Sequence, residues 1–260
     1  MSKIYEALNR ARDDDDDPKK PKPPAGKRAG SGSGSGSGTR GGFDPRILSE
    51  ELQKVAVDYE ALHSSMEKTL STVAGHAIMM VSSVEEEGTT TVAAEYASTL
   101  GRGIPRGTLL IDANFRNPTL HDVFDVPNDT GFADVLQDRA TLKQAVQTLA
   151  EGELYLLTAG LVDFSPSARI SGSVVSRFLA EAKAQYGAVV LDGPPVIPYP
   201  EAVHIASAAD GVVFIIESER TKREIVARAK DALDAVDANI LGVVLNRRRY
   251  VIPEFLYRQL

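Results

Sequence analysis

The sequence contains no cysteine and no tryptophan among its 260 residues. Without cysteine, the chain cannot form disulfides, cysteine-ligated zinc or iron–sulfur sites, or a thiol nucleophile. It has no apolar run of the roughly 18 to 20 residues that a membrane-spanning helix needs, and it does not open with a secretory signal. These absences predict a cytoplasmic protein that reaches a membrane only through a partner.

Basic charge is scarce relative to acidic charge, with 29 lysines and arginines against 36 aspartates and glutamates. Residues 1–45 hold nine basic and seven acidic side chains, so their net charge is +2. Because the net charge of the whole chain is −7, residues 46–260 carry a net charge of −9. An acidic body repels the phosphate backbone of nucleic acids. The charge distribution therefore predicts no nucleic-acid partner.

Composition divides the chain into three regions. Residues 1–12, MSKIYEALNRAR, have helical apolar spacing, which fits either a fraying terminus or a helix that docks on a partner. Residues 13–46 combine an acidic run, lysine–proline repeats and serine–glycine alternation, a composition typical of a disordered linker. Residues 47–260 have the patterning of one folded domain, beginning with a long amphipathic helix at 47–72.

Within this domain, short apolar runs alternate with helical patterns. Strands are predicted at 77–82, 108–113, 154–158, 188–191, 211–217 and 240–246, and helices at 90–101, 141–150, 173–186, 201–208 and 221–236. The apolar runs are continuous, which indicates strands buried on both faces. The predicted fold is α/β, a mostly parallel sheet with helices on both faces, and its ligands bind at the carboxyl ends of the strands.

Three strand ends carry a distinctive combination of motifs. The first strand runs into SSVEEEGTTTVAA at 82–94, the second is part of LLIDANFRNPTLH at 109–121, and the fourth is part of VVLDGPPV at 189–196, with GFADVL at 131–136. Over about residues 50–260, this combination resembles the bacterial tyrosine kinases. They are P-loop autokinases, related to the partition ATPases, that regulate capsule and exopolysaccharide assembly. The resemblance implies a P-loop NTPase architecture with ATP and Mg²⁺ as cofactors.

The resemblance also assigns roles to the loop after the first strand, whose backbone amides would cradle phosphates at a helix N-terminus. Gly88 is retained, Thr90 stands at the Mg²⁺-binding hydroxyl, and Thr91 follows it. However, Thr89 stands at the position of the phosphate-binding lysine, and Glu86 replaces a glycine. No lysine or arginine lies between Val73 and Leu100. We therefore expect a phosphate site that has lost attraction and, through three adjacent glutamates, gained repulsion.

The residues at the other strand ends match the motifs of the tyrosine-kinase family more completely than the loop at 82–94 does. The resemblance makes Asp112 a catalytic and metal-binding group, Asp192 an Mg²⁺ ligand through water, and Arg116 a further site cation. Asn114 replaces the family's second aspartate and is a degenerate catalytic position, because an amide cannot act as a base. Asn246 stands where relatives contact adenine.

Family features outside the nucleotide site are weaker in this chain. Val57, Glu60 and His63 stand at the positions of the helical motif with which relatives build a ring, and none of them is the family's residue. The resemblance therefore gives little support to a homo-oligomer. The tail carries two candidate phosphoacceptors, Tyr250 and Tyr257, and both rings also fit a role in packing the tail onto the domain.

The sequence is compatible with three functions. The favoured one is a regulatory or scaffold protein with an eroded nucleotide site, which partners a membrane-embedded polysaccharide co-polymerase. The second is an active tyrosine autokinase of exopolysaccharide biosynthesis. The third is a partition-type ATPase, which the acidic body and the motif at 109–121 both disfavour.

Overall fold

The computed structural model describes residues 75–247. The expected docking helix at 1–12, the linker at 13–46, the helix at 47–72 and both tail tyrosines lie outside the described residues. Within residues 75–247, no helix combines the length and the apolar character needed to cross a membrane.

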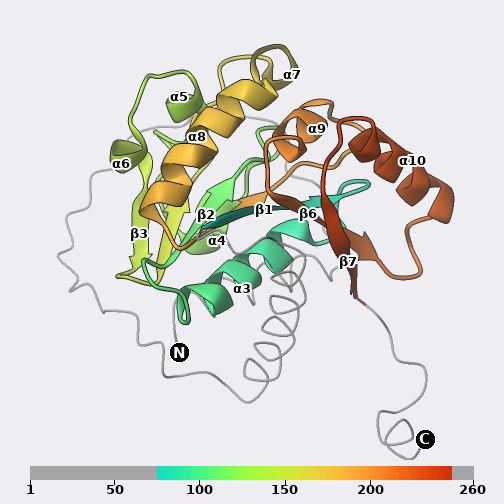
Figure 1. Cartoon of the computed structure of the whole chain (residues 1–260), viewed down its shortest axis with the longest axis horizontal. Coiled ribbons are helices and arrows are strands. Elements are labelled where there is room, and N and C mark those ends of the chain that lie inside the picture. The colour runs from blue at the N-terminus through green and yellow to red at the C-terminus, as the bar shows by residue number, and fades with distance from the viewer. Residues whose placement is uncertain (1–74, 248–260) are drawn as a thin grey trace, which may run out of the picture.

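A seven-stranded sheet forms the centre of the described domain, in the order β3-β4-β2-β5-β1-β6-β7 (Figure 1). All neighbouring strands pair in parallel except β3 and β4, which are antiparallel. The strands are β1 His76–Ser82, β2 Thr108–Asp112, β3 Gln147–Ala150, β4 Leu154–Leu157, β5 Ala188–Asp192, β6 Gly211–Glu217 and β7 Ile240–Asn246. The predicted mostly parallel sheet is confirmed.

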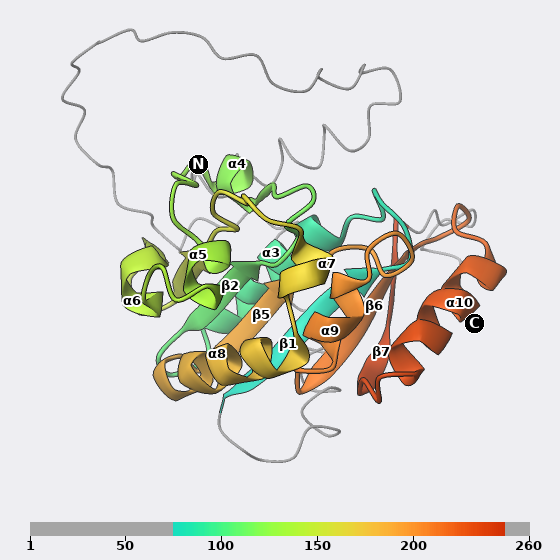
Figure 2. The same ribbon diagram turned by 90° about the horizontal axis from the view of Figure 1, so that it is seen from above.

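Helices cover both faces of this sheet (Figures 1 and 2). One face packs against α3 Thr89–Gly101 and α4 Leu120–Phe124. The other face carries α5 Phe132–Leu136, α6 Leu142–Ala145, α7 Pro166–Arg169, α8 Gly172–Gln185, α9 Glu201–Ala206 and α10 Arg223–Asp234. Alternate residues of β1 enter the two cores: Met79 enters one and Met80 the other. Burial on both faces explains why the strands read as continuous apolar runs.

One element differs from the prediction. Residues 141–150 were expected to form a single helix, but only Leu142–Ala145 is helical, and Gln147–Ala150 forms β3. Val146 turns extended at φ −74° and ψ 136°, and Gly152 in the following turn has φ +75°. This turn brings β3 back against β4 as a hairpin, so the edge pairing overrides a weak helical pattern.

Sheet register gathers the strand ends that carry the motifs. Asp112 at the end of β2 pairs with Asp192 at the end of β5, and β1 lies on the other side of β5. The loop 83–88 connects the end of β1 to α3. The motif residues of three strands therefore meet at the carboxyl ends of these strands, as expected for a parallel sheet.

Candidate functional site

The loop between β1 and α3 contains two residues with positive φ, Glu86 and Gly88. Gly88 precedes the first turn of α3 with φ +83°, and a Cβ at this position would lie 2.2 Å from the Asn246 side-chain nitrogen. Glu86 also has a positive φ, 68°, a conformation that suits glycine and is uncommon for other residues. The backbone thus keeps the shape that the resemblance implies, while the sequence has placed a glutamate at a glycine-like position.

A hydroxyl and two carboxylates meet at the start of α3. The Thr90 hydroxyl donates a hydrogen bond of 2.7 Å to Asp192 Oδ2, and Asp192 Oδ1 is buried without a hydrogen-bond partner among residues 75–247. Asp112 lies beside Asp192 and accepts from the amides of Thr119 and Leu120 at 3.0 Å each. These oxygens suit a hard divalent cation such as Mg²⁺, and the unpartnered Asp192 oxygen leaves a ligand position available.

Burial shifts the proton affinities of both carboxyl groups. Desolvation raises the pKa of Asp112 to about 7, although backbone hydrogen bonds from Leu120, Asn114 and Thr119 oppose this. Desolvation also raises the pKa of Asp192 well above its ordinary value, and the neighbouring charge of Asp112 raises it further. The pair holds a proton more readily than free carboxylates do, and a bound cation would favour the ionised forms.

Three further candidate site residues, Thr89, Thr91 and Asn114, have uncharged side chains. Thr89 is buried, with 8% of its surface exposed, and Thr91 is half-buried on the first turn of α3. Asn114 uses its side-chain oxygen locally, accepting from the amide of Asn117 at 3.2 Å. The position where the resemblance expects a phosphate-binding lysine is therefore a short, uncharged, buried side chain.

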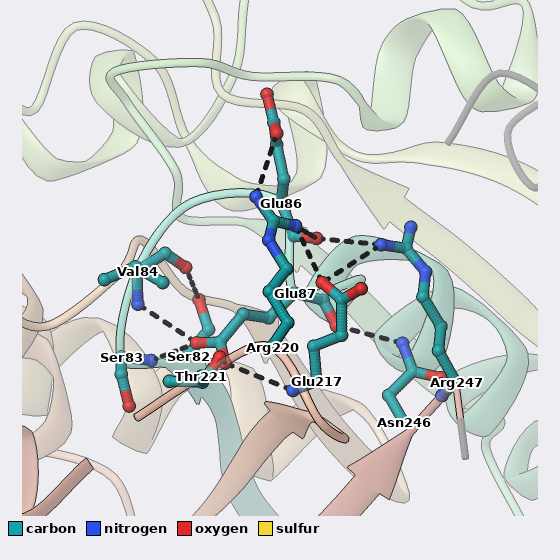
Figure 3. Close-up of polar contacts among 10 residues, drawn as sticks. All are labelled: Ser82, Ser83, Val84, Glu86, Glu87, Glu217, Arg220, Thr221, Asn246 and Arg247. Atoms are coloured by element: carbon teal, nitrogen blue, oxygen red, sulfur yellow. Dashed lines mark hydrogen bonds and ion pairs between the residues drawn. The ribbon is translucent and has the colours of Figure 1, made fainter. Parts of the chain in front are cut away.

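The Glu87 side chain points into the protein, toward Ser83, Val84 and the end of β6 (Figure 3). Only 1% of the residue's surface is exposed. It accepts from the amides of Ser83 at 2.7 Å, Val84 at 3.0 Å and Glu217 at 3.1 Å, and from the Thr221 hydroxyl at 2.5 Å. These four donors satisfy the buried charge, so Glu87 ties the loop to the end of β6 instead of facing a ligand.

Two arginines contact the outer side of the same loop (Figure 3). Arg220 pairs with the carboxylates of Glu217 at 2.7 Å and Glu86 at 3.3 Å. Arg247 pairs with Glu217 at 3.4 Å and donates to the Glu86 carbonyl at 3.0 Å. The acidic cluster expected from the sequence is thus largely neutralised, because Glu86 and Glu217 have cationic partners and Glu87 has four donors.

Arg116 is also engaged. Its guanidinium donates to both carboxylate oxygens of Glu201, at 2.5 and 3.3 Å, and Glu201 is completely buried. The same guanidinium lies over the ring of Tyr199, 5.4 Å from the centroid. Tyr199 in turn donates to Glu85 of the loop at 2.5 Å. Arg116 therefore organises the loop's surroundings through Glu201 and Tyr199.

Asn246 lies against the loop at the end of β7. Its side-chain amide donates to the Glu87 carbonyl at 2.9 Å, and its side-chain oxygen accepts from the Arg247 amide at 2.9 Å. The structure thus brings together Gly88 and Asn246 on one side, and Thr90, Asp112 and Asp192 on the other. The two tail positions, Tyr250 and Tyr257, lie outside the described residues.

Sequence reasoning missed Glu201, Tyr199 and the group formed by Glu217, Arg220 and Thr221. The signal for that group was available, because it begins at the end of β6, and residues after a parallel strand are the ones to inspect. The buried position of Glu87 carries no local signal, since two of its donors come from residues more than 100 positions later. Residues 75–247 hold no cluster of three or more metal-ligating histidine or acidic side chains.

Comparisons with known proteins identify the family. No protein-family model matches the sequence. The chain is 34% identical over 172 residues to the tyrosine-protein kinase YwqD of Bacillus subtilis, an alignment that covers 66% of this chain and 72% of that one. It is 27% identical over 173 residues to the succinoglycan biosynthesis transport protein ExoP of Rhizobium meliloti, covering 65% of this chain but only 22% of that one.

A solved structure gives the same result for the fold. The crystal structure of the chimerical protein CapA2B2 superposes with a TM-score of 0.69 and 26% identity, covering 79% of this chain and 88% of that one. The likeness therefore extends through the sheet and its helices as well as the motifs. Together with the match to the Bacillus subtilis kinase, it shows that this chain belongs to the bacterial tyrosine-protein kinase family.

Proposed function

We propose that this protein is a regulatory or scaffold member of its family, with a nucleotide site too weak to support phosphoryl transfer. One observation carries the proposal: the position of the phosphate-binding lysine is the buried, uncharged Thr89. The arginines described near the loop contact its outer side, at the Glu86 carbonyl and the Glu86 and Glu217 carboxylates. They are engaged in holding the loop, and neither replaces the lysine at the start of α3.

The magnitude of this loss supports an inactive site. Removing one donor or cation that stabilises the transferring group costs about 3–4 kcal/mol, which corresponds to about 10²–10³-fold in rate. Because Glu87 points inward and Glu86 is paired, repulsion between carboxylate and phosphate contributes less than the sequence suggests. The missing cation is therefore the larger of the two effects.

Metal binding is better supported than triphosphate binding. Thr90 and Asp192 would hold Mg²⁺, with Asp112 beside them, and the unpartnered Asp192 oxygen fits this assignment. When bound beside a polyphosphate, Mg²⁺ neutralises part of its charge. This retained half of the site is the observation that favours the alternative function, an active autokinase that tolerates an unusual loop.

We propose a place for the protein in polysaccharide assembly. One relative is named as a succinoglycan biosynthesis transport protein, and this name supports the proposal. As a cytoplasmic protein, it would reach the inner face of the membrane by binding a membrane-embedded polysaccharide co-polymerase. Residues 1–12 are the candidate docking helix, so their deletion is expected to abolish capture of that partner without lowering the melting temperature.

Restoring the family residues tests the eroded site. The double variant Thr89→Lys with Glu86→Gly is expected to raise the affinity for Mg²⁺-ATP by about 10²-fold, as judged by isothermal titration calorimetry. Thr91→Lys is the matched control, because it adds the same charge two residues further along α3. Equal affinities for the double variant and the wild type would contradict the assignment of position 89.

A further inference from the structure

A tyrosine beside the loop has no role in the proposed function. Tyr199 is half-buried in the segment that leaves the end of β5. The Val196 amide donates to the Ser82 carbonyl at 2.9 Å, and the Ile197 amide donates to the Ser83 carbonyl at 3.2 Å. These two bonds hold the segment against the beginning of the loop, so Tyr199 stands at the carboxyl edge of the sheet.

The hydroxyl of Tyr199 has a base within contact distance. It donates to Glu85 Oε1 at 2.5 Å, and Glu85 is exposed. This hydrogen bond, together with desolvation, raises the pKa of Tyr199 above its ordinary value. The phenol is therefore protonated at neutral pH and needs a base to remove its proton when its oxygen attacks phosphorus. A carboxylate that accepts the hydroxyl proton of the substrate is the arrangement that protein kinases use.

The ring is held in one orientation. The Arg116 guanidinium lies 5.4 Å from the ring centroid, within the range of cation–π attraction, and Arg116 is fixed by the buried Glu201. Because the ring and the segment are both positioned before any reaction, little rotational freedom is lost when the hydroxyl is presented to a phosphoryl donor.

The other tyrosines among residues 75–247 lack this presentation. Tyr96 belongs to α3 and is completely buried. Tyr155 and Tyr186 pack against each other, with ring centroids 5.1 Å apart, near the amino ends of β4 and β5. Tyr199 is the described tyrosine that combines partial exposure with a hydrogen bond to a carboxylate.

We propose that Tyr199 is a phosphorylation site and that Glu85 receives its proton. The Tyr199 oxygen forms a bond to the γ-phosphorus of ATP, the bond from that phosphorus to the bridging oxygen breaks, and ADP leaves. The phenolic proton passes to the Glu85 carboxylate. The ATP is bound either by this chain or by a second, catalytically competent tyrosine kinase, and the function proposed above requires the second source.

Phosphorylation would change the contacts of the loop. A phosphotyrosine carries about −1.5 to −2 charges near neutral pH, and it would replace a hydrogen bond to Glu85 with repulsion from the same carboxylate. The segment that carries Tyr199 would therefore separate from the loop. Hydrogen exchange of the amides of residues 83–88 would then become faster in the phosphorylated protein.

Two parallel incubations of the full chain test the proposal. One contains Mg²⁺-ATP alone, and the other also contains an active bacterial tyrosine kinase, for which the Bacillus subtilis relative is the probe. The modified residues are mapped by tandem mass spectrometry. We expect phosphate on Tyr199 only when the second kinase is added, loss of this signal in Tyr199→Phe, and an unchanged signal in the control Tyr155→Phe.

The outcomes separate this proposal from the previous one. Phosphate on Tyr199 with ATP alone would support the phosphorylation site but contradict the inactive nucleotide site. No phosphate on Tyr199 in either incubation would overturn the phosphorylation site and leave the inactive nucleotide site standing.

A second variant tests the proton acceptor. Glu85→Gln keeps an oxygen acceptor but cannot take the proton, so the initial rate of Tyr199 phosphorylation is expected to fall about 10²-fold. Glu224→Gln, at the exposed start of α10, is the control and should leave the rate unchanged. An unchanged rate for Glu85→Gln would contradict its assignment as the base.

Discussion

Replacing Glu87 by alanine should destabilise the domain far more than its place in a loop would suggest. The change removes a carboxylate that accepts from four donors: the amides of Ser83, Val84 and Glu217 and the Thr221 hydroxyl. Each buried donor left without an acceptor costs about 1–3 kcal/mol, and these costs do not add fully because water enters the space left behind. We therefore expect the free energy of unfolding to fall by about 3–5 kcal/mol.

Urea denaturation measures this effect. The midpoint should shift to lower urea concentration while the slope of the transition stays constant, because the area exposed on unfolding hardly changes. Glu87→Gln should lie between the alanine variant and the wild type, since it retains one acceptor oxygen but places an amide group near donors. Glu224→Ala, on the exposed start of α10, is the control. A loss below about 1 kcal/mol for Glu87→Ala would refute the reasoning, because that is the contribution of a single ordinary hydrogen bond.

Two further predictions concern the buried carboxylates. Arg116→Ala leaves Glu201 as an unpaired buried charge, so we expect the free energy of unfolding to fall by about 3 kcal/mol in denaturant titrations. The control Lys230→Ala breaks an exposed ion pair and should change the free energy of unfolding little. Equal losses for the two variants would contradict this reasoning. Asp112 has a folded-state pKa of about 7 against an ordinary value near 3.8, so its stabilising contribution is complete below pH 3.8 and is lost as the pH rises to 7. Stability measured across that window should fall with rising pH, and Asp112→Asn should flatten the slope; a slope that Asp112→Asn leaves unchanged would assign the effect to other groups.

The centre of the sheet was predictable because β1, β2, β5 and most of β6 are buried on both faces. Runs such as VVFII in β6 remain apolar along their length, and this pattern depends on the local sequence alone. The edge of the sheet was harder to predict. Within the described part of the chain, β3 pairs only with the antiparallel strand β4. Its residues 147–150 were assigned to a helix because no local pattern reveals a hairpin at the edge of the sheet.

The site was predictable in position and only partly in detail. The motifs located Gly88, Thr90, Asp112 and Asp192, which the structure brings to one edge of the sheet. The direction in which the loop's glutamates point was not predictable, because the donors to Glu87 and the partners of Glu86 come from the ends of β6 and β7. A local count of charges therefore overstated the repulsion at the loop.

Equilibrium binding of Mg²⁺-ATP to the wild-type full chain tests most directly whether the loop binds phosphate weakly because position 89 is a buried threonine. Isothermal titration calorimetry should show a dissociation constant of about 0.1–1 mM, since losing about 3–4 kcal/mol from a micromolar site gives this range. A dissociation constant near 1 µM would contradict the account, because it would mean that this site binds a triphosphate without a lysine at position 89.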